Sequence, residues 1–314
     1  MTILRQTSLV QSYQACQEMM RQDSESLHQA FSLLPADRFR AVAAIYAFRH
    51  YVHSLIVDAN LAEADALAQF DALEQAIEAM YQPEMALPEA VASLVWFPAF
   101  VETVQHYQVE KAALIEQLHG QKVNIGFTEL ETTDQLIEYC RHVGGSVGMM
   151  LWPILGRDDL LAEADQTPYL QVCYDIATGM QLTSVLRDVG EDAVQYKRVY
   201  LPATVLKAHG LSKYCILALS QQRADAAHLP FGFKQVWQSV AEQGEEFYNV
   251  VDSHLVDFHP SCRLAVLAVS LLYRAIEDEI KQADFDCISQ RHDTSRWQRM
   301  AVVNRAKKLV AQIS

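Results

Sequence analysis

Apolar side chains recur at spacings of three and four residues along almost the whole of this 314-residue chain, for example in residues 39–47 and 264–272. This spacing places apolar groups on one face of an α-helix. No stretch alternates apolar and polar residues for long enough to build a sheet. The 11 glycines and 9 prolines together amount to about half of their usual share. The pattern therefore predicts long helices with few tight turns, packed as an all-α bundle.

Glycine and proline mark the expected ends of these helices. The breaks fall at residues 34–37, 82–83, 87–88, 144–145, 156 and 201–202. The segments between them have ordinary helical lengths, and the sequence contains no internal repeat and no glycine-rich phosphate loop. We therefore expect residues 1–314 to form a single domain.

The overall charge argues against one class of partner. Lysine and arginine number 25 against 39 aspartates and glutamates, which gives a formal net charge of −14. Nucleic acid would be repelled by such a surface as a whole, so we expect no nucleic-acid partner. An anionic substrate must instead meet a local basic cluster or a metal ion.

Cysteine usage and the lack of apolar spans predict where the protein resides. The six cysteines include no CxxC pair, which argues against a zinc site and is typical of buried thiols in a reducing cytoplasm. No signal peptide is evident, and no apolar run reaches the ~18 residues of a membrane span, so we expect a soluble, cytoplasmic protein.

Residues 296–308 are basic and partly amphipathic. They could touch an anionic membrane surface, although we favour a solvated helix face.

The most informative segment is GMQLTSVLRDVGEDAVQYKRVYLP, residues 179–202. On a helix, Gln181, Ser184, Asp188 and Asp192 follow one another at three, four and four residues and therefore share a face. Two carboxylates at this spacing can share Mg²⁺, a hard cation that completes its shell with substrate phosphates. A DxxxD pair alone is more often a solvated helix face, so the surrounding residues must decide between the two interpretations.

Those surrounding residues resemble the second acidic motif of the squalene and phytoene synthases. The pattern of that motif is close to QLTNILRDVGED followed by an R-x-YLP-like run. Ser184 replaces its usual asparagine. The residues that match are Gln181, Arg187, Asp188, Asp192, Arg198 and Tyr200.

Further segments resemble other elements of the same family. YCRHVGGSVG at residues 139–148 is similar to YCYxVAGTVG, whose small residues would let a substrate chain pass close to the backbone. SESLHQAFSLLP at 24–35 and AIYAF at 44–48 are similar to its N-terminal elements. Residues 273–280 and 291–299 fall where the family carries a Y-xx-I-x-DEI run and a phosphate-facing arginine. The similarity covers essentially the whole chain and is strongest toward the bacterial dehydrosqualene synthases.

This resemblance implies a helical bundle of the isoprenoid synthase type with a central cavity. It also implies a magnesium-dependent prenyltransferase that condenses two prenyl diphosphates head to head and releases pyrophosphate. The substrate would be farnesyl or geranylgeranyl diphosphate, and the product dehydrosqualene or phytoene. The sequence leaves the chain length and the use of NADPH open.

The resemblance further implies roles for individual residues. Asp188 and Asp192 would bind Mg²⁺, and Arg187, Arg198 and Arg291 would bind phosphate. The remaining assignments are Tyr46, Tyr200 and Tyr273 for diphosphate contact or steering of the intermediate, Gln181 and Ser184 for the cavity wall, and Ser24 and Ser26 for substrate binding. Tyr46 and Tyr273 could equally be core tyrosines.

One acidic motif of the family is missing from this chain. In the family, the AIYAF segment continues as CR-xx-DD-xx-D, which supplies an arginine and a first set of metal-binding aspartates. The corresponding residues in this chain are His50, His53, Ser54 and Val57. Arg49 and Asp58 lie one position away, which is ~100° of rotation on a helix, so we do not expect either to take over the role. Asn124 stands at a further acid of the family, and Leu27 at an aromatic position.

Three explanations of this loss remain open. His50 and His53, three residues apart, could help to hold a different metal, although exposed or core histidines are the more ordinary interpretation. The intact motif could bind one diphosphate and support altered chemistry. Lastly, the protein could be a non-catalytic relative that binds a prenyl lipid or a partner protein. Of these, we favour an enzyme.

Overall fold

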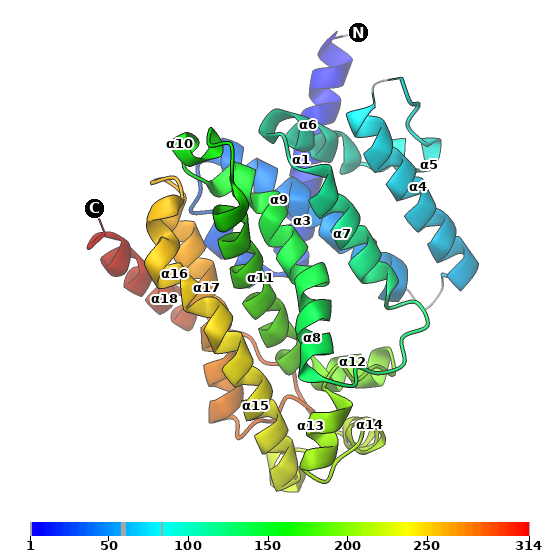
Figure 1. Cartoon of the computed structure of the whole chain (residues 1–314), viewed down its shortest axis with the longest axis vertical. Helices are drawn as coiled ribbons and strands as arrows, with labels where there is room; N and C mark the ends of the chain where they lie inside the picture. The colour runs from blue at the N-terminus through cyan, green and yellow to red at the C-terminus, as the bar shows by residue number, and fades with distance from the viewer. Residues whose placement is uncertain (1, 58–60, 83, 314) are drawn as a thin grey trace.

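The computed structural model describes residues 2–57, 61–82 and 84–313, and it confirms the all-helical class (Figure 1). No strand occurs within those ranges, where one isolated antiparallel bridge joins Gly156 to Phe258. No helix in the same ranges has both the length and the apolar character that a membrane crossing requires.

The helices follow one another along the chain with short connections. The first half contains α1 (Thr2–Asp23), α2 (Glu25–Phe31), α3 (Ala36–Val57), α4 (Glu63–Tyr81), α5 (Glu89–Ala92), α6 (Phe97–Tyr107), α7 (Lys111–Lys122), α8 (Thr133–Cys140), the π-helical turn η1 (Arg141–Gly145) and α9 (Ser146–Leu155). The second half contains α10 (Asp158–Leu161), α11 (Thr167–Arg187), α12 (Val189–Gln195), α13 (Ala203–Ala208), α14 (Lys213–Gln222), η2 (Ala226–His228), α15 (Phe231–Tyr248), α16 (Val250–His254), η3 (Leu255–Asp257), α17 (Arg263–Gln282) and α18 (Arg296–Val310).

Helix α11 lies at the centre of the bundle. It packs against α9, η1, α15 and α17, and Figure 1 shows it between the column of α8 and α9 and the pair α15 and α16. Glycines let η1 and α9 approach it closely: a Cβ on Gly144 of η1 would lie 2.6 Å from the Cβ of Gln181, and a Cβ on Gly148 of α9 would overlap the carbonyl oxygen of Cys173. Only a residue without a side chain fits at these contacts.

The break expected at residues 144–145 was a wrong prediction. The chain instead runs from α8 through η1 into α9 without leaving the helix. A π-helical turn inserts one extra residue into the helical repeat, so it changes the face that the following residues present. Gly144 and Gly145 are buried against α11. Their lack of a side chain therefore serves helix packing here, and no chain reversal follows from it.

Most of the other expected boundaries are confirmed. Pro35 lies between α2 and α3, Pro88 precedes α5, Gly156 follows α9 and Pro202 precedes α13. Helix α4 ends just before residue 83, which lies outside the described residues. Proline at these positions removes a backbone donor, which is why helices begin after it and end before it.

The basic C-terminal stretch forms α18, which packs along α17. Ser295 and Gln298 close its N-terminus with a capping box. On the inner face Arg299 is buried and its guanidinium lies 2.7 Å from the carboxylate of Glu25. On the outer face Trp297 is 75% exposed. One face of this helix therefore belongs to the core and the other to the surface.

Candidate active site

A cavity of about 370 Å³ lies inside the bundle, between α1, α2, α3, α9, α11, α12 and α17. Its lining changes character along the helices. On α3 the lining residues pass from Val42 near its start to Arg49 and beyond, and on α11 they pass from Cys173 to Ser184 and Arg187. One end is therefore apolar and the other carries charged and hydroxyl groups. Such a cavity suits an amphiphilic ligand with a long apolar tail.

The residues of the acidic motif come together at the polar end. Gln181, Ser184, Asp188 and Asp192 all line the cavity. They do not lie on one uninterrupted helix as expected, because α11 ends at Arg187 and α12 begins at Val189.

The cause of this break is a tertiary contact. The N–H of Gly190 donates to the carbonyl oxygen of Cys287 at 3.0 Å, and a Cβ on Gly190 would overlap the backbone of Ile288. Hydrogen bonds from the N–H of Asp188 to the oxygen of Ser184 (2.9 Å) and from the N–H of Asp192 to the oxygen of Asp188 (2.8 Å) keep the helical spacing across the break. The predicted alignment of the carboxylates therefore survives.

Two arginines hold the first of these carboxylates. The side chain of Arg187 donates to both carboxylate oxygens of Asp188 at 2.7 and 2.6 Å, and Nε of Arg291 donates to one of them at 2.8 Å. Nε of Arg291 also lies 3.2 Å from the carboxylate of Glu191. Burial alone would raise the pKa of Asp188, but the charges and hydrogen bonds of Arg187 and Arg291 hold it below its usual range. Asp188 is therefore ionised at neutral pH.

The second carboxylate has no such partner. In the described part of the chain, the side chain of Asp192 makes no hydrogen bond and no ion pair, although it lies beside Asp188 and Glu191. Burial and these two negative neighbours raise its pKa well above the usual range. A buried carboxylate without a counter-charge is unfavourable unless a proton or a cation accompanies it. The residues present therefore fit a hard cation at this end of the cavity.

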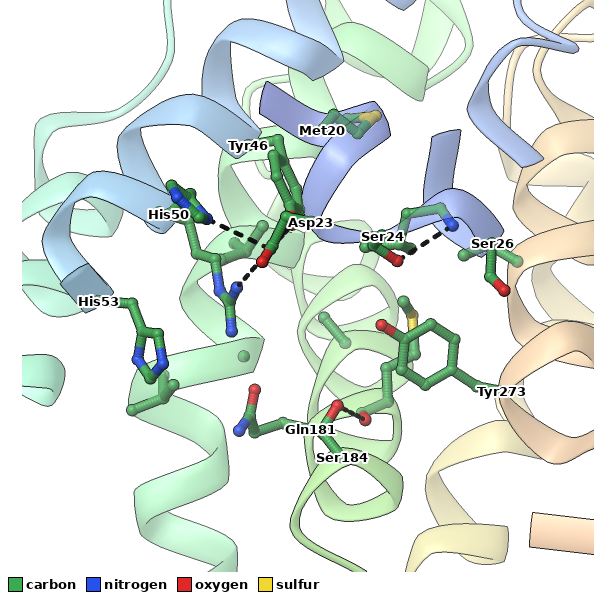
Figure 2. A pocket seen from close by; sticks show the side chains of 18 of the residues that line it. Met20, Asp23, Ser24, Ser26, Tyr46, His50, His53, Gln181, Ser184 and Tyr273 are labelled. Atoms are coloured by element: carbon green, nitrogen blue, oxygen red, sulfur yellow. Dashed lines mark hydrogen bonds and ion pairs between the residues drawn. The ribbon is translucent and has the colours of Figure 1, made fainter. Parts of the chain in front are cut away.

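The opposite wall is formed by Asp23 at the end of α1 and by four residues of α3, namely Tyr46, Arg49, His50 and His53. Figure 2 shows Asp23, Tyr46 and His50 on one side of the pocket and Gln181 and Ser184 on the other. We call the set Asp23, Tyr46, Arg49 and His50 the Asp23 cluster.

Asp23 is the hub of this cluster. Its carboxylate accepts a hydrogen bond from the hydroxyl of Tyr46 and lies 3.2 Å from Nδ1 of His50 and 4.0 Å from Nη1 of Arg49. Burial would raise the pKa of Asp23, but the hydrogen bonds from His50 and Tyr46 and the charge of Arg49 hold it well below its usual range. Sequence reasoning missed Asp23, because an aspartate at a helix end gives no indication of partners on another helix. The position of Arg49 in the lining also differs from the expectation based on helical rotation.

His53 is a neutral part of the same wall. Its Nδ1 lies 3.5 Å from Oε1 of Gln121. Burial and the nearby charge of Arg49 lower its pKa to about 4. Among the described residues, no group of three or more His, Cys, Asp or Glu side chains is placed to hold a metal ion. The alternative of a histidine metal site at His50 and His53 is therefore not supported, while Asp188 and Asp192 provide two carboxylates that would need ligands from substrate and water.

Comparison with known proteins identifies the family. A family model for squalene/phytoene synthase matches residues 20–298, which is most of the chain. The chain belongs to the squalene/phytoene synthase family. Within it, a phytoene synthase of Arthrospira platensis is 28% identical over 295 residues, which is 92% of this chain and 90% of that protein. A 4,4'-diapophytoene synthase of Staphylococcus haemolyticus is 26% identical over 306 residues, which is 96% of this chain and 98% of that protein.

Solved structures give the same result for the fold. The crystal structure of a dehydrosqualene synthase in complex with ligand superposes with a TM-score of 0.83 at 22% sequence identity, over 98% of this chain and 99% of that chain. This similarity confirms the isoprenoid synthase fold. The phytoene and dehydrosqualene synthases of the squalene/phytoene synthase family condense two prenyl diphosphates head to head.

Most of the residues that the sequence singled out as family site residues meet at the cavity. Those that line it are Ser24, Ser26, Tyr46, Gln181, Ser184, Arg187, Asp188, Asp192, Tyr273 and Arg291. Oγ of Ser26 donates to Asp293 at 2.9 Å, and Oγ of Ser24 accepts from the N–H of Leu27 at 3.3 Å. Tyr273 lies within the electrostatic influence of both Arg49 and Arg187, so it stands between the two walls.

Arg198 and Tyr200 are not among the described residues that line the cavity. Nη2 of Arg198 donates to the carbonyl oxygens of Ile56 and Asn124, both at 3.1 Å. The hydroxyl of Tyr200 donates to Oδ1 of Asn124 at 2.6 Å. In this structure Arg198 therefore ties the end of α3 to the segment after α7, and Tyr200 bonds to the same segment. Asp58, the other residue near the missing motif, lies outside the described residues.

Proposed function

We propose that this protein is an active prenyltransferase that condenses two prenyl diphosphates head to head and releases pyrophosphate. The observation that carries the proposal is the pair Asp188 and Asp192 at the polar end of a cavity whose other end is apolar. The apolar end would hold the prenyl chains away from water, which protects a carbocation from premature capture. The polar end would hold the diphosphates.

The carboxylates of Asp188 and Asp192 would hold Mg²⁺, which would stabilise the negative charge that develops on the leaving pyrophosphate. Arg187 and Arg291 orient Asp188 through direct hydrogen bonds and, since both line the cavity, would contact the departing group. Tyr273 and Ser184 shape the wall beside it. Arg198 and Tyr200 act indirectly in this scheme, because they hold backbone and Asn124 in place rather than facing the cavity.

The substrate is proposed to be farnesyl or geranylgeranyl diphosphate, with dehydrosqualene or phytoene as the corresponding product. The test is incubation of the purified protein with Mg²⁺ and each donor, followed by extraction and mass analysis of the hydrocarbon, with and without NADPH. A C30 or C40 hydrocarbon supports the proposal and identifies the substrate. Absence of product with every donor, beside an active family enzyme, would refute it.

A matched pair of variants assigns the site. We expect Asp192→Asn to reduce turnover at least about 100-fold, since metal assistance contributes several kcal/mol to such reactions. Asp252→Asn removes the same charge from an exposed position on α16 and should leave turnover unchanged. Wild-type turnover by Asp192→Asn would exclude the assigned site.

A second candidate is a non-catalytic family member that binds a prenyl lipid. The observation that favours it is the lack of any carboxylate among the α3 residues at the positions of the missing motif, namely His50, His53, Ser54 and Val57. Binding of a prenyl diphosphate with no turnover by any donor would favour this candidate over the enzyme.

We propose further that the chain folds as one domain and works in the cytoplasm. The family match from residue 20 to 298 supports the first point, and six unpaired cysteines support a reducing compartment. Peripheral contact with an anionic membrane through the outer face of α18 is supported by its basic residues and the exposed Trp297. Flotation with anionic and neutral vesicles tests this contact, and equal recovery with both would contradict it.

A further inference from the structure

The wall opposite Asp188 contains an arginine that is only loosely paired within the described part of the chain. Three arginines occur among the described residues that line the cavity: Arg49, Arg187 and Arg291. The latter two donate hydrogen bonds to Asp188. Arg49 makes no hydrogen bond within the described part of the chain, and its one ion pair, to Asp23, has a length of 4.0 Å. The five N–H donors of its guanidinium are therefore available to a ligand in the cavity.

His50 lies beside Arg49 on the same wall. Its Nδ1 lies 3.2 Å from Asp23, whereas its Nε2 has no partner among the described residues. The ring of His50 also stacks on that of Tyr46, with centroids 6.2 Å apart. Asp23 thus restrains both the imidazole and the guanidinium from one side and leaves their other edges toward the pocket.

The two walls therefore differ in how they can hold an anion. At the acidic motif, the described residues that line the cavity include three carboxylates, Asp188, Glu191 and Asp192, against two arginines, both of which are paired with Asp188. A phosphate would therefore need an added cation to bind there. On the α3 wall the nearest carboxylate is that of Asp23, and the charge of Arg49 is only loosely paired. An anion can bind at this wall by direct hydrogen bonds.

We propose that Arg49, positioned beside His50, binds the diphosphate of the second prenyl substrate directly, without a metal ion. This inference rests on the proposed function, and it assigns a substrate contact on α3 about one turn before the positions of the missing aspartates. The planar fork of a guanidinium matches two phosphate oxygens at once, which makes arginine suited to this contact. The fixed charge of Arg49 replaces a metal that the α3 residues no longer hold.

Asp23 has two opposing effects in this arrangement. It positions His50 and Arg49, but its negative charge also competes with the diphosphate for the guanidinium. Because the ion pair to Arg49 is long, the competing effect is modest, and we expect its removal to increase anion affinity. A carboxylate with a purely structural role would give the opposite sign, since its loss would only loosen the cluster.

The test measures binding of inorganic pyrophosphate to the purified full chain by calorimetry in EDTA. We expect the wild type to bind, Arg49→Met to bind about 10- to 100-fold more weakly, and Arg49→Lys to recover part of the loss. Asp23→Asn should bind at least about threefold more tightly. The control Arg305→Met removes the same charge from the exposed face of α18 and should bind as the wild type does.

A second series in Mg²⁺ separates this inference from the proposed function. Asp192→Asn frees no arginine, because none of the described residues forms an ion pair with Asp192. It should therefore abolish the added binding in Mg²⁺ and keep the binding in EDTA. Arg49→Met should abolish the binding in EDTA and keep the added binding in Mg²⁺. No pyrophosphate binding by the wild type in EDTA, or equal binding by Arg49→Met and Arg305→Met, would overturn the direct site while leaving the magnesium site standing. If Arg49→Met does not fold, tighter binding by Asp23→Asn supports the inference and unchanged or weaker binding overturns it.

Discussion

Replacing His53 with glutamine should change how the stability of the protein depends on pH. The pKa of His53 falls from 6.5 to about 4 in the folded protein because of burial and the charge of Arg49. The unfolded chain therefore takes up a proton below about pH 6.5 that the folded chain refuses until about pH 4. Wild-type stability is fully present above this window and is lost as the pH falls through it. Glutamine does not titrate, so His53→Gln removes the loss.

The expected magnitude follows from the same values. A fall from 6.5 to about 4 corresponds to about 3 kcal/mol at 1.4 kcal/mol per pH unit. His53 is only partly buried, so solvent screening reduces this, and we expect about 1 kcal/mol between about pH 7.5 and pH 5. The groups that set the value are Arg49, Gln121, Asp23 and His50.

Urea unfolding of the wild type and His53→Gln at several pH values measures the difference. The exposed His228, which pairs with Asp225 at 2.6 Å, provides the control variant His228→Gln. The two proteins are compared by plotting the free energy of unfolding against pH. If the wild-type plot ran parallel to that of His53→Gln between about pH 7.5 and pH 5, His53 would have the same pKa in the folded and unfolded chains. The description of the α3 wall as Arg49 beside a neutral imidazole would then be wrong.

Three further outcomes test other contacts. Gly148→Ala should destabilise the protein by about 1–3 kcal/mol in urea unfolding, because the new methyl group would overlap the carbonyl oxygen of Cys173; unchanged stability would contradict the close packing of α9 on α11. Phe258→Leu should shift turnover toward the longer prenyl donor, because Phe258 lines the cavity and is buried; an unchanged ratio of products from the two donors would place the end of the cavity elsewhere. Arg299→Met should lower stability by about 1–3 kcal/mol, because it removes the hydrogen bonds that the buried Arg299 donates to Gln29 and to the carbonyl oxygen of Thr294; a melting temperature equal to that of the wild type would contradict this.

Spacing along the chain predicted the parts of the structure that depend on local geometry. Apolar residues three and four apart gave the helices, and Asp188 and Asp192, four apart, do line one cavity. Residues such as Pro35 and Pro202 marked boundaries because they lack a backbone donor wherever they occur. These features follow from properties of neighbouring residues, so no knowledge of the tertiary fold was needed.

The features that escaped prediction depend on contacts between distant segments. The break at Asp188 is made by the hydrogen bond from Gly190 to Cys287, nearly 100 residues away. Arg198 turns to carbonyl oxygens of two other segments instead of the cavity. Arg49 lines the cavity despite a one-residue offset, because its long side chain can reach beyond the direction of its own Cβ.

The unequal walls of the cavity have a consequence for a reaction between two copies of one molecule. Two identical substrates in identical surroundings would have no basis for taking different parts in the reaction. Here one copy would meet carboxylates that require a divalent ion, and the other would meet Arg49 in a fixed place. The surroundings would thus break the symmetry of the pair. Residues of α3 and α12 would determine which molecule ionises and which molecule supplies the double bond that attacks the resulting carbocation.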